Sequence, residues 1–264
     1  MGNASKRLRR EKKQKAAKTT RIVLIIFSIV LALALIGALI FALIPDKVQN
    51  SESGKAGNNG SDNASANNGN KTEGKSYGHV TLNVSYTDKN GNSHTGDIVI
   101  ELRDDCAPIT VANFKKLVSE GYYDGTDFFR IVEGFMIQGG ENDSMTADYI
   151  KGEFALNGVN NPLKHVRGTV SMARLGDNYD GSAITYSDGV VSYNSASSGF
   201  FIVQEDYTYG DGQYAAFGTV VAGMEHVDAI AGTELVSSDK YQGAIVAPKY
   251  PAIINSATLQ EASN

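Results

Sequence analysis

Residues 128–140 read Phe-Phe-Arg-Ile-Val-Glu-Gly-Phe-Met-Ile-Gln-Gly-Gly. We expect a strand-like segment here, in which side chains two residues apart share a face. This places Arg130 in the same segment as Phe135, Met136 and Gln138. A cation that faces buried aromatic and thioether surface is costly unless it has a function there. The alternative is an ordinary strand whose arginine side chain extends along the protein surface, so that its charge stays in water.

The sequence around this stretch predicts a mainly β domain. Residues 79–86 alternate between apolar and polar side chains, which is typical of a half-buried strand, and Asn90-Gly91 marks the following turn. Further strands are expected at 97–102, 168–173, 199–204, 215–221 and 253–259, with helices at 108–120 and 223–231. Many short strands separated by turns indicate a closed or sandwiched antiparallel architecture.

The charge of the chain is unevenly distributed. Residues 1–21 contain nine Lys and Arg side chains and a single acid, Glu11. Residues 22–264 therefore carry 15 basic and 28 acidic side chains, a formal net charge of −13. We expect a basic cytoplasmic tail at 1–21, and no nucleic-acid binding by so acidic a remainder.

An uncharged segment of 23 residues at 22–44 predicts a transmembrane helix, since about 20 apolar residues span a bilayer. The alternative is a secretory signal peptide, but its apolar core is shorter and a small-residue cleavage site should follow. The basic residues before the span predict a cytoplasmic N-terminus. We therefore expect a single-pass membrane protein whose residues after the span are extracytoplasmic.

Residues 45–77 are rich in Asn, Gly and Ser, which predicts a disordered linker because such a segment buries little apolar surface. Ordered structure is expected over 78–260. The single cysteine, Cys106, excludes an intrachain disulfide, which suits the outer face of a bacterial membrane.

Metal-dependent and hydrolytic chemistry finds little support in the sequence. The segment 177–181 resembles the start of a calcium loop but lacks its ligand alternation, and no nucleophile-elbow or phosphate-loop motif occurs. The four histidines show no metal-ligand spacing: His79, His94, His165 and His226. We expect neither a metal nor a cofactor.

Five segments together resemble the cyclophilins, which are peptidyl-prolyl cis/trans isomerases. They occur in the family's order and lie at 128–140, 149–154, 163–174, 194–202 and 216–224. The resemblance covers about residues 78–260. It implies an eight-stranded antiparallel closed β-barrel capped by two α-helices. Because such a barrel has no open sheet edge, we expect a monomeric domain.

The resemblance also implies the chemistry and the site. Rotation about an X-Pro bond faces a barrier of about 18–20 kcal/mol, which a donor aimed at the twisted amide nitrogen lowers. Arg130 would be that donor, and Gln138 would orient it. The residues expected to bind the proline-containing polypeptide are Phe135, Met136, Ala173, Arg174, Gly199, Phe201, Tyr209 and Tyr214.

Several positions depart from the family pattern. Phe129 replaces a histidine, Gly199 replaces a glutamine, and Tyr209-Gly210 replaces a Trp-Leu pair. A longer loop is inserted at about 175–193. Two function classes therefore stay open. One is an isomerase that assists the folding of exported or cell-surface proteins, and the other is a catalytically weak module that binds proline peptides.

Overall fold

The structure is a computed structural model that describes residues 77–178 and 181–262. The predicted tail at 1–21, the predicted span at 22–44 and residues 45–76 of the predicted linker lie outside the described residues. Among the helices that the structure does describe, none combines the length and the apolar character needed to cross a bilayer.

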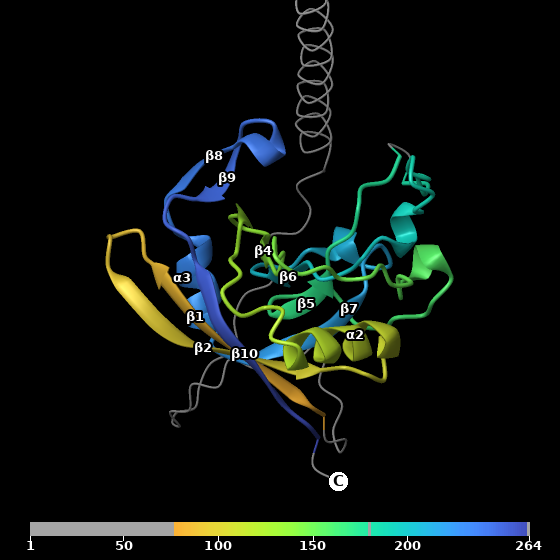
Figure 1. The fold of residues 1–264 in the computed structure, drawn as a ribbon, viewed down its shortest axis with the longest axis horizontal. Helices are drawn as coiled ribbons and strands as arrows, with labels where there is room; N and C mark the ends of the chain where they lie inside the picture. The colour runs from red at the N-terminus through yellow and green to blue at the C-terminus, as the bar shows by residue number, and fades with distance from the viewer. Residues whose placement is uncertain (1–76, 179–180, 263–264) are drawn as a thin grey trace, which may run out of the picture. The chain divides into compact units, whose positions relative to one another are not determined.

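Eight strands form one antiparallel sheet in the order β10-β1-β2-β7-β5-β6-β4-β3, and the sheet curls around the main core (Figure 1). The strands are β1 His79–Thr87, β2 Ser93–Leu102, β3 Arg130–Val132, β4 Met136–Gly139, β5 Thr169–Met172, β6 Phe200–Val203, β7 Ala216–Ala222 and β10 Ile253–Gln260. The predicted eight-stranded, mainly β fold is confirmed.

The expectation of a closed barrel is wrong, because the edge strands β3 and β10 do not pair along their length. One isolated bridge, Asp127 to Ile253, spans the gap. Beside it, the Phe128 N–H donates to the Ala252 carbonyl at 2.8 Å. The contact with β10 is thus made by residues before β3, which is only three residues long, and the sheet is a half-barrel.

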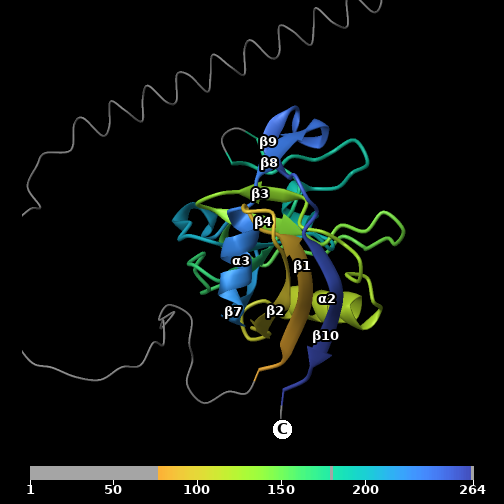
Figure 2. The same cartoon turned by 90° about the vertical axis from the view of Figure 1, so that its left-hand side faces the viewer.

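Two helices cover the sheet from different sides, as predicted (Figure 2). Helix α2, Pro108–Ser119, packs near β10 and β7, and α3, Met224–Ala231, packs near β2 and β4. No side chain next to the start of α2 caps it. Instead, the buried Glu153 carboxylate accepts hydrogen bonds from the Ile109 and Thr110 N–H groups at 3.0 and 2.8 Å. A residue from a distant loop thereby provides an acceptor for N–H groups that have no partner within the helix.

The stretch at 128–140 is two strands, not the one segment expected. Strands β3 and β4 pair with each other and are joined by a tight turn. The Phe135 N–H donates to the Val132 carbonyl at 3.0 Å, and Gly134 has a φ of 74°, which favours glycine. The turn reverses the chain and brings Gln138 opposite Arg130.

A second, two-stranded sheet was not expected from the sequence. It pairs β8, Leu235–Ser238, with β9, Ala244–Pro248, and carries the short 3₁₀ helix η4, Asp239–Tyr241, at its tip. We call residues 235–248 the β8–β9 hairpin. It lies at the β3 and β4 end of the main sheet, and β9 contacts β3 (Figures 1 and 2). The other 3₁₀ helices are η1 Ala155–Asn157, η2 Ser192–Asn194 and η3 Thr208–Gly210.

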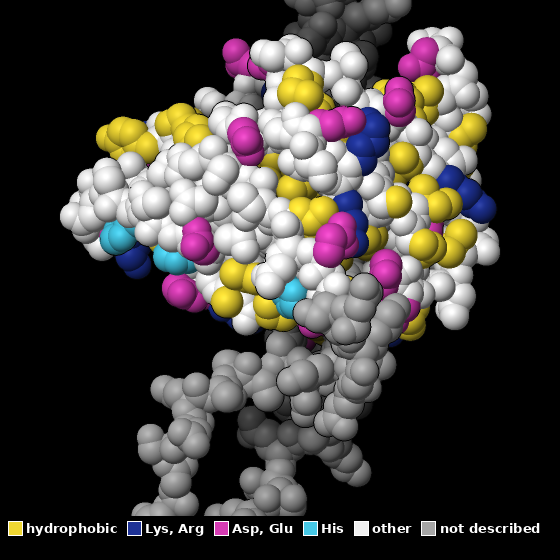
Figure 3. Space-filling view, turned by 60° about the horizontal axis from the view of Figure 1, so that its bottom comes forward, with side chains coloured by type: hydrophobic (Ala, Val, Ile, Leu, Met, Phe, Trp, Pro, Cys, Tyr) yellow, Lys and Arg dark blue, Asp and Glu magenta, His cyan; other side chains and the backbone are white. Residues whose placement is uncertain are grey.

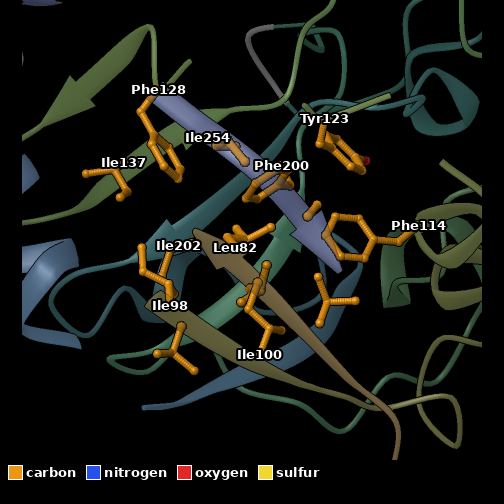
Figure 4. Close-up of a cluster of buried hydrophobic side chains, with 14 of the residues drawn as sticks. Leu82, Ile98, Ile100, Phe114, Tyr123, Phe128, Ile137, Phe200, Ile202 and Ile254 are labelled. Atoms are coloured by element: carbon orange, nitrogen blue, oxygen red, sulfur yellow. The ribbon is translucent and has the colours of Figure 1, made fainter. Parts of the chain in front are cut away.

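The core fills the space inside the curled sheet, where side chains from β1, β2, β4, β6 and α2 point toward one another (Figure 4). Strand β1 buries every second residue, which matches the predicted alternation. Phe114 of α2 packs against Tyr123, Phe200 and Phe217, with ring centroids 4.9–5.5 Å apart. On the surface, the face shown in Figure 3 has hydrophobic side chains scattered among charged ones.

Phe114→Ala should lower the free energy of unfolding by about 3–5 kcal/mol, because it opens a cavity among three aromatic rings. Urea unfolding of the full-length protein, followed by tyrosine fluorescence, measures this. Ile109→Ala on the same helix is the control, since Ile109 is 44% exposed. The control should change stability by less than about 0.5 kcal/mol. Equal effects of the two substitutions would contradict the assignment of Phe114 to the core.

Candidate active site

The site is built on one row of residues that crosses four strands. Arg130 on β3 pairs with Gln138 on β4, Gln138 with Phe201 on β6, and Phe201 with Ser171 on β5. Successive residues of a strand face opposite sides of the sheet. The neighbours Ile131, Ile137, Phe200 and Ile202 accordingly face the main core. The row therefore projects from the other side of the sheet.

A cavity of about 220 Å³ opens beside this row. We call it the inner cavity. It is large enough for a small ring, since a water molecule takes about 30 Å³. Its lining is aromatic and aliphatic apart from Arg130, Gln138 and Arg174, and consists of Arg130, Phe135, Met136, Gln138, Ala173, Arg174, Phe201, Tyr207 and Tyr214.

Arg130 reaches the rim of the inner cavity as a half-buried cation. Its Nη1 donates to the Gln138 Oε1 at 2.9 Å, which holds one nitrogen of the guanidinium. No carboxylate is ion-paired with Arg130 within the described part of the chain. Arginine carries five N–H donors, so the bond to Gln138 leaves others for a bound ligand.

A larger cavity of about 590 Å³ adjoins the inner one, and we call it the outer cavity. The two share Arg130, Gln138, Ala173 and Arg174. An extended ligand can therefore contact Arg130 while it fills both.

The structure brings eight of the ten predicted site residues together around the inner cavity, namely Arg130, Gln138, Phe135, Met136, Ala173, Arg174, Phe201 and Tyr214. Gly199 lines the outer cavity instead. A side chain at this position would have room, since an added Cβ would lie 3.6 Å from the Ala173 Cβ.

Tyr209 was predicted to bind substrate, and the structure places it elsewhere. It lies on η3 with 77% of its surface exposed and lines neither cavity. Tyr207 lines the inner cavity in its stead and packs against Phe135 with ring centroids 3.9 Å apart. Sequence reasoning missed Tyr207, since three tyrosines follow β6 and only the path of the chain places Tyr207 and Tyr214, but not Tyr209, at the inner cavity.

His165 supports the inner cavity from behind. It is buried and stacks on Phe201, with ring centroids 6.0 Å apart at 20°. Its ring nitrogens contact Asp211 Oδ1 at 3.2 Å and Ser171 Oγ at 3.1 Å. The glycine at 210 is explained by this packing, because a Cβ there would lie 2.8 Å from His165 Cγ.

Arg174 organises the inserted loop rather than pointing into solvent. Its guanidinium donates two hydrogen bonds of 2.6 Å to Asp177 and lies about 5 Å from the rings of Phe154, Tyr193 and Tyr214. Its side chain is only 3% exposed, so its charge is neutralised within the wall. Arg130 therefore supplies the cation of the site.

Burial has a direct electrostatic effect on His165. Desolvation lowers the pKa of His165, and the opposing hydrogen bond and charge of Asp211 do not outweigh it. For Asp211, desolvation acts to raise the pKa, but hydrogen bonds from His165 and the charge of Lys164 leave that pKa lowered. The pair is therefore a neutral imidazole beside an ionised carboxylate at neutral pH.

No group of three or more His, Cys, Asp or Glu side chains is placed to hold a metal ion among the residues that the structure describes. The expectation that no metal or cofactor is used stays a prediction.

The family model for cyclophilin-type peptidyl-prolyl cis-trans isomerases matches residues 86–257 of this chain. The chain is 36% identical to peptidyl-prolyl cis-trans isomerase A of Dickeya dadantii strain 3937, covering 69% of this chain and 84% of that protein. It is also 36% identical to peptidyl-prolyl cis-trans isomerase B of Escherichia coli K12, covering 64% of this chain and 98% of that protein.

A cyclophilin-type isomerase of Cryptosporidium parvum has a similar fold in its crystal structure, with a TM-score of 0.50 and 24% identity. The match covers 71% of this chain and 99% of that one. The half-barrel thus has the fold of the cyclophilins. The chain belongs to the cyclophilin family, whose members bind proline-containing peptides, and it is a cyclophilin-type peptidyl-prolyl cis-trans isomerase.

The lowered pKa of His165 makes the stability depend on pH. Below about pH 6.5 the unfolded chain protonates this histidine while the folded protein does not, so acid favours unfolding. We expect the wild type to lose up to about 1.4 kcal/mol per pH unit through His165 between pH 6.5 and its lower folded pKa. Urea unfolding at several pH values measures this slope. His165→Gln should reduce it, and an unchanged slope would exclude His165 as the cause.

Proposed function

We propose that this isomerase catalyses prolyl rotation through Arg130 and acts, anchored to a membrane, on exported or cell-surface polypeptides. One observation supports catalysis by Arg130. A single row of residues sets the guanidinium of Arg130, held by Gln138, beside an apolar cavity.

The inner cavity supplies binding. Phe135, Met136 and Phe201 offer apolar surface to a proline ring, and burial of that ring expels water. Removing water also strengthens the interaction of a nearby cation, because the local dielectric constant falls.

Arg130 supplies the catalysis. As the amide twists, its nitrogen loses conjugation and gains a lone pair that accepts a hydrogen bond. The planar amide offers no such acceptor, so the guanidinium stabilises the twisted state more than the ground state. No covalent intermediate or cofactor is needed for a bond rotation.

The proposal of a membrane anchor rests on residues 22–44 and on the basic residues before them. An extracytoplasmic domain would act on chains that have crossed the membrane unfolded, when slow X-Pro isomerisation limits their folding.

Arg130→Ala should lower kcat for a proline peptide at least about tenfold, because a charge-assisted hydrogen bond contributes about 1.5–3 kcal/mol. Peptide affinity should change less, since the planar substrate does not use this bond. Arg130→Lys should restore little, as an ammonium lacks the planar fork. Isomerisation kinetics over a range of peptide concentrations measure both constants.

Arg167→Ala is the matched control for the loss of an arginine. Arg167 pairs with Asp228 and lines neither cavity. Activity of the wild type no higher than that of Arg130→Ala would refute catalysis by Arg130 and favour the peptide-binding module. The peptide-binding module stays a specific alternative because Gly199 leaves open space in the outer cavity, where the family pattern has a glutamine side chain.

Protease added to intact bacteria that express the full chain should remove residues 46–264, because the positive residues of 1–21 retain the N-terminus inside. Immunoblotting against the C-terminal domain measures the loss, with a cytoplasmic protein as the internal control. Complete protection of the domain until the cells are lysed would reverse the proposed topology.

A further inference from the structure

We propose that Tyr241, at the tip of the β8–β9 hairpin, is a positioning residue that holds Arg130 for catalysis. The Arg130 Cζ lies 5.3 Å from the centroid of the Tyr241 ring. Tyr241 is half-buried and lines the outer cavity next to Arg130 and Gln138. The proposal rests on the catalytic role of Arg130 argued above.

Arg130 needs such a partner because β3 is short and lies at an edge of the sheet. Among the described residues, its side chain has the one hydrogen bond to Gln138 and no ion pair. A guanidinium with one partner can still rotate about its long side chain. An aromatic face attracts the cation and removes water from one of its sides. Two partners in different directions thus restrict the guanidinium more than either alone.

The hairpin reaches Arg130 from a separate sheet. It shares no ladder hydrogen bonds with the eight-stranded sheet, and an isolated two-stranded hairpin has little stability of its own. At its base, the Lys249 N–H donates to the Glu234 carbonyl at 2.8 Å, and their side chains form an ion pair at 2.8 Å. The placement of the tip therefore depends on side-chain contacts with the main domain.

Lys240 provides those contacts beside Tyr241. Its ammonium is ion-paired with Glu141, which follows β4. The same ammonium lies 4.3 Å from the centroid of the Phe129 ring, directly before Arg130 in the chain. These two contacts link the tip to Phe129, directly before Arg130, and to Glu141, three residues after Gln138. They set the Tyr241 ring over the guanidinium.

The turn that carries Tyr241 is itself well defined. The Gly243 N–H donates to the Ser238 carbonyl at 2.9 Å, and the Gln242 N–H donates to the Asp239 carbonyl at 3.2 Å. Gln242 has a φ of 56°, the only positive φ of a non-glycine residue in the described chain. The turn fixes the direction in which Tyr241 projects.

The test compares three substitutions of Tyr241 in the full-length protein, purified in a mild non-ionic detergent and assayed with a short proline peptide. Tyr241→Ala should lower kcat about fivefold and change KM less than about twofold, because the loosened guanidinium affects the twisted state. Tyr241→Leu, which keeps apolar bulk without an aromatic face, should resemble Tyr241→Ala. Tyr241→Phe should recover most of the lost activity, since the ring and not the hydroxyl contacts the cation.

Tyr250→Ala is the matched control. Tyr250 lies just after the hairpin, is 47% exposed and contacts Lys249, away from both cavities. It should keep wild-type kinetics. Thermal unfolding of each variant shows whether the protein stays folded, so that a lower kcat can be attributed to a displaced Arg130 side chain.

A double-mutant cycle separates this inference from the role of Arg130. In an Arg130→Ala background, Tyr241→Ala should cause no further loss, since the side chain that it positions is gone. Wild-type kcat in Tyr241→Ala, a rise in KM alone, or an equal loss in the Arg130→Ala background would overturn the role of Tyr241. A wild type no more active than Arg130→Ala would instead refute the role of Arg130 itself.

Discussion

The antiparallel register of β3, β4 and β6 is the constraint on which the site depends. It sets Arg130, Gln138 and Phe201 in one row, each directly opposite the next. Side chains alternate between the two faces of a strand, so a slip of one residue would turn Arg130 into the core and Ile131 toward the cleft. The filled core prevents that slip, because Ile131, Ile137, Phe200 and Ile202 beside the row are large apolar side chains packed on the other face. Packing on one side of the sheet thus fixes the positions of the candidate site residues on the other.

The packing of His165 against Phe201 explains one of the positions at which this chain departs from the family pattern. His165 stacks beneath Phe201 and occupies the space that a side chain at position 210 would need. Tyr207 then covers Phe135 from the side, although the chain contains no tryptophan. The glycine at 210 therefore indicates a repacked pocket and not a lost one. The glycine at 199 is different, since it leaves open space in the outer cavity.

Two further segments surround the cleft in this protein. The inserted loop is tied to the wall by the buried pair Arg174 and Asp177, and the β8–β9 hairpin approaches Arg130 from the β3 edge. Both segments line the outer cavity, the loop through Leu175 and the hairpin through Tyr241. The row of the sheet holds Arg130, the proposed catalytic residue, whereas these two segments line the space next to it.

Much of this protein was predictable from local sequence. Alternation predicted β1, periodicity and Pro108 predicted α2, and the resemblance predicted eight of the residues around the inner cavity. The strand and the helix depend on residues close together in the chain, and the site residues were predicted because their motifs match those of the family. The open seam between β3 and β10, the choice of Tyr207 over Tyr209 and the docking of Tyr241 on Arg130 were decided only in the tertiary structure. Each depends on contacts between segments far apart in sequence, and no local pattern records such contacts.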